Sequence, residues 1–333
     1  MLTLAEHWSQ KHSITLFWDD QTMVQKAEDR FNLDLSKVAV MPNFFTSRFL
    51  AAKLYQSGRY DCIFFLSDGS IPMSLARYNI LHFQVPFAHV SMSSWKAVRY
   101  QHIVCNSDFT QKHLDKTLKI ETSVIYPPVD IGKLVSGKKT KTILSVGRFS
   151  GLYGAKKQDI LIQTFREGID KGHFDGWKLV FAGGLLPSDI VYFEELQQKA
   201  DGLPVEFHPN CPFSELRGLY SEAAIYWHAA GYGETKPAHM EHFGITTVEA
   251  MASGAIPVAF AGGGQPDIIV DGKNGFLWTT KDQLYKKTLI AMRNNEVVSK
   301  IIREAKKTAG NFSKERFIHE FDVLLARVCK TNF

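Results

Sequence analysis

Two glutamates and a run of glycines lie close together in the sequence, and their types suit a small ligand with both negative charge and hydroxyl groups. The segment 241–276 reads EHFGITTVEAMASGAIPVAFAGGGQPDIIVDGKNGF, and seven residues separate Glu241 from Glu249. Gly244 predicts a turn, after which a helix is expected to begin near Thr246, with Glu249 one turn inside it. Amide groups at a helix start have no intrahelical partner and carry partial positive charge, so this turn predicts a phosphate site.

The glycines at 262–264 and the two glutamates extend this candidate site. A residue without Cβ lets a ligand approach the backbone closely, although a plain turn would also explain three glycines. Glu241 and Glu249 would repel a diphosphate, so we expect their carboxylates to accept hydrogen bonds from hydroxyl groups of a sugar and a ribose. The alternative is a pair of solvated glutamates on a helix face. Phosphate donors beside hydroxyl acceptors suit a nucleotide sugar.

The motifs of this segment resemble those of a known family. Glu-x7-Glu, followed in order by AMASG, PV, GGG and DGKNGF, resembles the retaining GT-B glycosyltransferases of family 4, the glycosyl transferases group 1. The string EHFGITTVEAMA is similar to the subgroup that includes the mannosyltransferases of lipid-linked oligosaccharide assembly. VGRFSGLYGAKKQDILIQTF (146–165) resembles the strand, Gly-Arg, lysine and helix of the same family. The resemblance covers nearly the whole chain and is strongest from 141 to 280.

The resemblance implies a catalytic role for four residues. Arg148 and Lys156 would bind the donor diphosphate, where two cations opposite a helix N-terminus would stabilise the leaving group. Glu241 would hold the sugar hydroxyls, and His82, in NILHFQVPF, would contact the sugar near its anomeric carbon. Surface cations and a satisfied core histidine are the alternatives, and Lys157 competes with Lys156 for the lysine role.

The same resemblance implies a wider set of donor contacts. In FHPNCPFSELRGLYSEAAIYW, backbone groups from His208 to Cys211 would face the nucleobase, and Glu215 would cap or orient their loop. Ser107 matches a common turn of the first domain, and Asp267 stands where the family often has glutamate. The expected donor-binding residues, of which Glu249 would hold the ribose, are Gly147, Lys157, His208, Phe243, Gly244, Ile245, Thr246, Glu249 and Gly263.

The reaction implied is transfer of a hexose from a nucleoside-diphosphate sugar to a hydroxyl acceptor, with the anomeric configuration retained. The acceptor is a glycan, a lipid-linked sugar or a small molecule, and GDP-mannose, UDP-glucose and UDP-GlcNAc all stay open as donors. No Asp-x-Asp motif occurs, so no metal is expected. No cofactor is expected either, since the nucleoside-diphosphate sugar is the donor substrate. The rival interpretations are a non-catalytic or truncated nucleotide-sugar-binding protein of this fold, a nucleotide-sugar epimerase and a phosphorylase.

The elements that would position these residues are short apolar runs alternating with amphipathic stretches. Strands that alternate with helices predict parallel sheets covered on both faces. The expected fold is therefore α/β, and the resemblance specifies GT-B, with two Rossmann-like doubly wound domains that face a central cleft. The predicted strands lie within 61–69, 102–116, 141–149, 177–184, 223–230 and 255–263.

Two prolines followed by a Gly/Lys/Thr stretch, in YPPVDIGKLVSGKKTK, indicate the boundary between domains. We expect an acceptor-side domain at 1–135, a nucleotide-sugar domain at 136–312 and a last helix at 313–333 that packs back toward the first domain. The chain begins at what resembles the helix after the family's first strand and Gly-rich loop, so that piece is expected to be absent.

Two features near the glutamates have no firm role in the sequence. GYGETKPAHM (231–240) is either a loop over the site with hinge glycines or an insertion without a role. His228, with Trp227 and Tyr226, is interpreted as core or strand-end packing.

Composition excludes several classes of protein. The 333 residues are 45% hydrophobic and 22% charged, which suits a soluble globular protein. The net charge of +5 is scattered, so no nucleic-acid partner is expected, whereas brief contact with an acidic membrane surface stays open. Four widely spaced cysteines and the absence of a long apolar run predict a cytoplasmic protein, peripheral at most to the inner face of a membrane.

Overall fold

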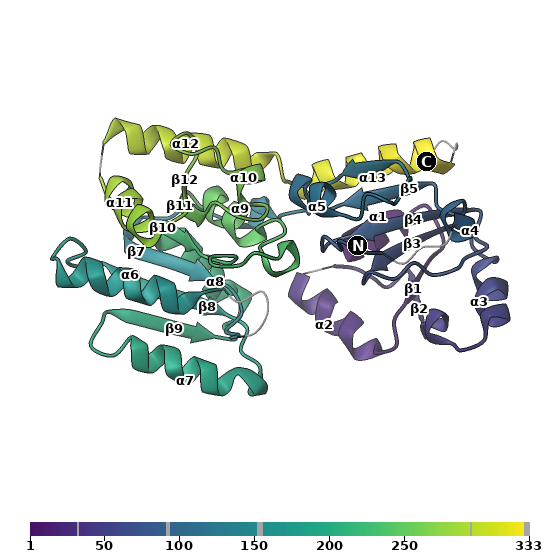
Figure 1. Ribbon diagram of the computed structural model, residues 1–333, viewed down its shortest axis with the longest axis horizontal. Helices are drawn as coiled ribbons and strands as arrows, with labels where there is room; N and C mark the ends of the chain where they lie inside the picture. The colour runs from purple at the N-terminus through teal and green to yellow at the C-terminus, as the bar shows by residue number, and fades with distance from the viewer. Residues whose placement is uncertain (32, 91–93, 152–155, 294, 330–333) are drawn as a thin grey trace. The chain divides into compact units, whose positions relative to one another are not determined.

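The computed structural model describes residues 1–31, 33–90, 94–151, 156–293 and 295–329 (Figure 1). The chain forms two compact units, each with its own parallel sheets and covering helices. The expected α/β class with parallel sheets is therefore confirmed. The first unit comprises Met1–Asn106, Leu114–Ile125 and Lys314–Phe333, and the second comprises Ser107–His113 and Tyr126–Ser313.

The second unit is built on a parallel sheet that has six strands within the described residues, in the order β12-β11-β10-β7-β8-β9. β7 and β10 lie at the centre of the sheet. β8 and β9 extend it on the side of β7, and β11 and β12 extend it on the side of β10. The strands are β7 (Thr140–Val146), β8 (Lys178–Gly183), β9 (Val205–Pro209), β10 (Ala223–His228), β11 (Ile256–Phe260) and β12 (Phe276–Trp278).

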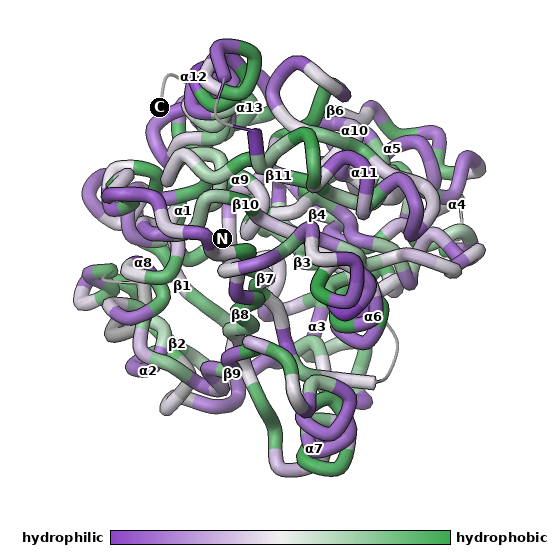
Figure 2. The backbone as a smooth tube through the Cα atoms, turned by 90° about the vertical axis from the view of Figure 1, so that its left-hand side faces the viewer, coloured by the Kyte–Doolittle hydropathy of each residue, from purple (hydrophilic) through white to green (hydrophobic). Residues whose placement is uncertain are grey.

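Both faces of this sheet are buried, as the continuous apolar runs of its strands predict. In β10, Ile225 and Trp227 belong to one hydrophobic cluster, while Tyr226 belongs to another. In Figure 2 the helices α6 and α7 alternate between hydrophilic and hydrophobic segments, as helices with one buried face do. The helices are α5 (Asp108–His113), α6 (Gln158–Asp170), α7 (Ile190–Lys199), α8 (Phe213–Glu222), α9 (Ile245–Ala252), α10 (Gln265–Ile268), α11 (Lys281–Ala291) and α12 (Glu296–Gly310).

The first unit contains two parallel sheets in its described residues. One pairs β1 (Ile14–Phe17) with β2 (Val38–Met41), and the other has the order β3-β4-β5-β6. The remaining elements are β3 (Cys62–Ser67), β4 (Tyr78–Phe83), β5 (His102–Cys105), β6 (Thr122–Val124), α1 (Leu2–Trp8), α2 (Gln21–Phe31), α3 (Leu50–Ser57), α4 (Ser94–Ala97) and α13 (Lys314–Cys329).

The C-terminal helix α13 is part of the first unit. Its Phe317 and Phe321 pack with Trp8 of α1 and with Ile80 of β4 in one hydrophobic cluster. Trp8 also donates a hydrogen bond of 2.7 Å to Asp322 of α13. The last helix of the chain thus completes the core of the unit that contains the first residues.

Lys139, which precedes β7, holds the carboxyl ends of two helices. Its Nζ donates to the carbonyl oxygens of Tyr220 (3.3 Å) and Ser221 (2.9 Å) in the last turn of α8, and to that of Ser253 (2.6 Å) after α9. Carbonyl groups at a helix end lack intrahelical partners and carry partial negative charge, which an ammonium group satisfies. The other end of α9 lies within the predicted phosphate site, so Lys139 helps to fix the position of that site.

We expect Lys139→Met to lower the free energy of unfolding of the second unit by about 1–3 kcal/mol, because the buried carbonyl groups lose their donor. The thermal melting temperature should fall by about 2–4 °C for each kcal/mol lost. Lys138→Met, at the exposed neighbouring position, is the matched control. Equal melting temperatures for the two variants would show that the hydrogen bonds of Lys139 add no stability.

Candidate functional site

The carboxyl ends of β7 and β10 define the position of the site. These two strands are neighbours in the sheet, and strand order reverses between them. In doubly wound sheets, ligands bind at the carboxyl edge where the order reverses. Gly147 follows β7 directly and His228 is the last residue of β10, so both lie at this edge.

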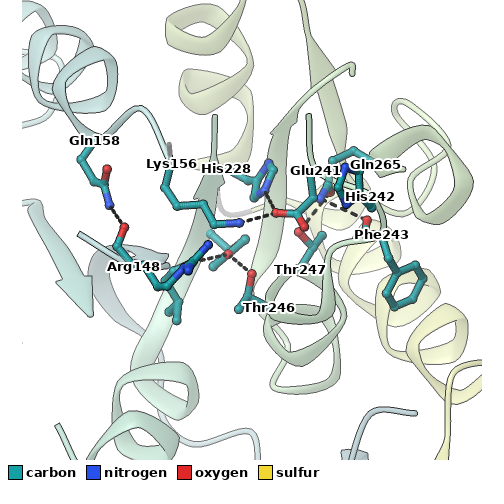
Figure 3. Close-up of polar contacts among 12 residues, drawn as sticks. Arg148, Lys156, Gln158, His228, Glu241, His242, Phe243, Thr246, Thr247 and Gln265 are labelled. Carbon is teal, nitrogen blue, oxygen red and sulfur yellow. Dashed lines mark hydrogen bonds and ion pairs between the residues drawn. The ribbon is translucent and has the colours of Figure 1, made fainter. Parts of the chain in front are cut away.

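Glu241 is the centre of a polar cluster at this edge (Figure 3). Its Oε2 accepts a hydrogen bond of 2.6 Å from Lys156 Nζ and one of 3.0 Å with His228 Nε2. The three residues come from the turn before α9, the loop before α6 and the end of β10. The structure thus brings together two residues that the sequence predicts as a site, Glu241 and Lys156, and adds His228 to them.

Charge balance keeps the Glu241 carboxyl ionised. Burial alone would raise its pKa, but the charge of Lys156 and the hydrogen bond from His228 lower the pKa well below its usual range. Burial also lowers the pKa of His228, although Glu241 opposes that effect. A neutral His228 therefore donates to an ionised Glu241, whose negative charge is balanced by Lys156.

The glycines at 263 and 264 pack directly under the turn that carries Glu241. A Cβ at Gly263, where φ is +65°, would lie 2.0 Å from the Glu241 carbonyl oxygen. A Cβ at Gly264 would lie 2.5 Å from the His242 carbonyl oxygen, and the Gly264 amide donates to Glu241 O at 2.7 Å. Glycine is required here by the protein's own backbone, and the predicted contact of Gly263 with a donor stays a prediction.

The turn continues into the N-terminus of α9, as the sequence predicts. Gly244 adopts φ +119°, and α9 begins at Ile245, one residue before the predicted start. Among the hydrogen bonds of the described residues, the amides of Ile245 and Thr246 have no acceptor. The Thr246 hydroxyl accepts a hydrogen bond of 2.7 Å from Tyr226 OH, and this bond fixes the first turn of the helix to β10. Free amides at a helix start are the feature that binds phosphate.

Phe243 contributes to this turn through its backbone. Its side chain is buried, with its ring tilted against that of Tyr126 and edge-on to that of Phe312, at centroid distances of 5.5 and 5.2 Å. Any contact of Phe243 with a ligand must therefore come from main-chain atoms.

The loop after β7 brings a cation to the turn. A Cβ at Gly147 would lie 2.5 Å from Cγ of Lys156, so glycine lets the Lys156 side chain pass over the strand end. Arg148 is exposed, and its carbonyl oxygen accepts a hydrogen bond of 3.0 Å from the side chain of Gln158 at the start of α6. Figure 3 shows the side chains of Arg148 and Lys156 both extending toward the region of Thr246 and Glu241.

Lys157 and Lys156 bind different carboxylates. Lys157 Nζ lies 2.7 Å from Glu234 Oε1, in the segment between β10 and Glu241. Lys156 is thus the partner of Glu241, whereas the choice of the lysine that binds the donor diphosphate stays a prediction.

Glu249 lies inside α9, on the side facing Tyr220. Its Oε2 accepts a hydrogen bond of 2.7 Å from Tyr220 OH. Burial raises the pKa of Glu249 to about 7, against the opposing effect of the Tyr220 hydrogen bond. Near neutral pH Glu241 is therefore ionised, whereas Glu249 is only partly ionised.

The ends of β8 and β9 form a second loop pair at the same edge. His208 Nδ1 lies 2.6 Å from Glu215 Oε1, which agrees with the orienting role expected for Glu215. Asn210 has φ +53°, and its main-chain N–H donates to Gly183 O at 2.8 Å. Its side chain accepts from the main-chain N–H of Leu185 and donates to the carbonyl oxygen of Leu185. Asn210 thus fixes the loop after β9 to the loop after β8.

Three other predicted residues have defined surroundings. Ser107 Oγ accepts from the Thr110 amide at 3.0 Å and so caps α5, and Asp267 Oδ2 accepts from the Phe109 amide at 3.1 Å. His82 belongs to the first unit, where its ring lies 6.0 Å from that of Phe321. Its ring nitrogens are buried without a partner among the described residues, and burial lowers its pKa to about 3. Its contact with a sugar stays a prediction.

Comparison with known proteins assigns the family. A family model described as Glycosyl transferases group 1 matches residues 128–308. GDP-Man:Man(3)GlcNAc(2)-PP-Dol alpha-1,2-mannosyltransferase of Xenopus laevis is 28% identical over 287 residues, which are 80% of this chain and 55% of that protein. The human protein of the same name is 29% identical over 238 residues, 65% of this chain and 46% of its own. The chain spans about half the length of these curated relatives.

Solved structures show the same fold. A glycosyltransferase from Rickettsia africae superposes with a TM-score of 0.75 at 15% identity, covering 99% of this chain and 94% of that one. The Anabaena protein Alr3699/HepE, solved in complex with UDP, has a TM-score of 0.74 at 18% identity and covers 98% and 94%.

The two parallel-sheet units define the chain as an α/β protein of the GT-B fold, as expected. The chain belongs to the glycosyl transferases group 1 family. Within the described residues, none of the helices combines the length and apolar character that crossing a bilayer requires.

The raised pKa of Glu249 predicts a measurable dependence of stability on pH. Its pKa of about 7 in the folded protein lies above the ordinary glutamate value of 4.5, so the folded state binds this proton more tightly than the unfolded state does. The stabilisation is complete below about pH 4.5 and is lost as pH rises through 7, with an upper bound of about 3 kcal/mol. We expect Glu249→Gln to gain stability relative to the unmodified protein as pH increases across this range, in thermal melts. If the melting temperatures of the two proteins change with pH in parallel, the raised pKa of Glu249 is contradicted.

Proposed function

We propose that this chain is a retaining hexosyltransferase that uses GDP-mannose as donor and a saccharide hydroxyl group as acceptor. The observation that carries the proposal is the cluster of Lys156, ionised Glu241 and the free amides at the start of α9, at the carboxyl edge where strand order reverses. Mannose is favoured because the relatives reported above are named for transfer from GDP-Man.

In this proposal the donor diphosphate lies against the amides of Ile245 and Thr246, with Lys156 and Arg148 as counter-charges. A helix N-terminus and two cations stabilise the negative charge that develops on the leaving group. This arrangement takes the place of a metal ion. Glu241, ionised and buried, accepts hydrogen bonds from sugar hydroxyls, and Glu249 does so from the ribose.

The chemistry we propose keeps the anomeric configuration. The bond from the anomeric carbon to the phosphate oxygen breaks, the bond to the acceptor oxygen forms on the same face, and the leaving phosphate oxygen takes the acceptor proton. The nucleobase is placed between the loops after β8 and β9, which Asn210 joins. The acceptor class we propose, a glycan or lipid-linked sugar, rests on the names of the relatives.

A nucleotide screen tests the donor. We expect GDP to raise the melting temperature more than UDP or ADP, because a ligand at 100 times its Kd adds about 2.7 kcal/mol of stability. GMP and phosphate serve as controls for the base and the charge. A shift with UDP alone would replace the donor assignment, and no shift with any nucleotide would contradict the donor site itself.

Substitution of Glu241 tests catalysis. Glu241→Gln keeps the shape but removes the charge that accepts the sugar hydroxyls, so turnover of GDP-mannose should fall by about 10²-fold or more. Glu194→Gln, on the exposed surface of α7, is the matched control and should retain full turnover. Release of GDP and the anomeric configuration of the product, followed by NMR, are the measurements. Nucleotide binding without any transfer in the unsubstituted protein would favour the non-catalytic binding protein instead.

A further inference from the structure

The segment between β10 and Glu241 is fastened to the loop before α6 by a second ion pair. Glu234 Oε1 lies 2.7 Å from Lys157 Nζ, and Glu234 Oε2 lies 3.4 Å from His239 Nδ1. The side chains of Lys157 and Glu234 are half-buried, with 24% and 26% of their areas exposed. The hydrogen bond from Lys157 lowers the pKa of Glu234, so the pair is charged at neutral pH.

The backbone at Lys157 shows that this pair has a defined geometry. Lys157 adopts φ +55° and ψ +40°, a left-handed conformation that it shares with Asn210 alone among the described non-glycine residues. A long side chain in this region is uncommon and strained, and it persists where neighbouring contacts over-determine it. The ion pair with Glu234 is such a contact.

Two adjacent lysines therefore pair with two carboxylates, one within the segment and one directly after it. Lys156 binds Glu241, which directly follows the segment, and Lys157 binds Glu234 within it. The glycines at 231 and 233, with φ of +92° and +74°, shape the turn that presents Glu234. Because Lys156 and Lys157 are adjacent, the direction of one side chain depends on how the other is held.

We propose that the Glu234–Lys157 pair is a positioning pair, which holds the backbone before α6 so that Lys156 points at Glu241 and at the donor diphosphate. Lys157 then acts through Lys156 and does not bind phosphate itself. This inference rests on the proposed function of the site. It assigns a role to the segment 231–240, whose function the sequence leaves open.

Titration calorimetry with GDP distinguishes the two roles of Lys157. If Glu234 and Lys157 are a positioning pair, Glu234→Gln and Lys157→Met should each weaken GDP binding about tenfold. The double variant should then bind GDP no more weakly than either single variant. If Lys157 bound phosphate directly, Lys157→Met would weaken binding, whereas Glu234→Gln would free the lysine and leave affinity unchanged or higher. That second pattern would overturn the inference.

Charge exchange and a matched control complete the test. Glu234→Lys combined with Lys157→Glu restores the pair in reverse and should recover most of the lost affinity, which a general loss of folding would not do. Glu167→Gln breaks the exposed pair with Lys171 at the other end of α6 and should leave binding unchanged. If the unsubstituted protein binds no nucleoside diphosphate, the proposed function fails together with this inference. If it binds GDP normally while Glu234→Gln has no effect, the positioning role alone fails.

Discussion

One largely buried carboxylate, that of Glu241, organises the candidate site. Lys156 and His228 hold it ionised, and each comes from a different element of the second unit. A buried charge is tolerated only when it is paired and hydrogen-bonded, so the three elements are fixed together by the same atoms. Gly263 and Gly264 are required because the backbone of this turn rests on them. The geometry of the site thus follows from the cost of leaving Glu241 unpaired.

The sheet supplies the other constraint. The reversal of strand order between β7 and β10 leaves an open edge at which a loop, a strand end and a helix start converge. Helix α9 is fixed at both ends, by Tyr226 at Thr246 and by Lys139 at Ser253. Its free amides are therefore held in place, as the proposed anion site requires, because a pre-organised site loses little entropy on binding.

The sequence predicts much of this arrangement, and what it misses has a physical reason. The positions of β3, β5, β7, β8, β10 and β11 follow from apolar runs, and the start of α9 follows from Gly244. These are local signals, whereas β1, β2, β6, β9 and β12 lie outside the predicted runs. The pairing of Lys157 with Glu234 spans 77 residues, so no local pattern indicates it. His228 looks like packing because it ends a buried strand, and it is indeed buried, but its Nε2 also contacts Glu241. The structure adds a reason for glycine at 263 that the sequence does not indicate, since the backbone of Glu241 leaves no room for a Cβ there.

The central claim is that the β-phosphate of a nucleoside diphosphate binds between Lys156 and the start of α9. Calorimetric titration of GDP and GMP against the unsubstituted protein and Lys156→Met tests it most directly. GDP should bind at least about tenfold more tightly than GMP, and Lys156→Met should remove most of that difference, because charge-assisted contacts to phosphate are worth about 1.5–3 kcal/mol. Equal affinities for the two nucleotides, or a preference for GDP that Lys156→Met leaves intact, would contradict the account.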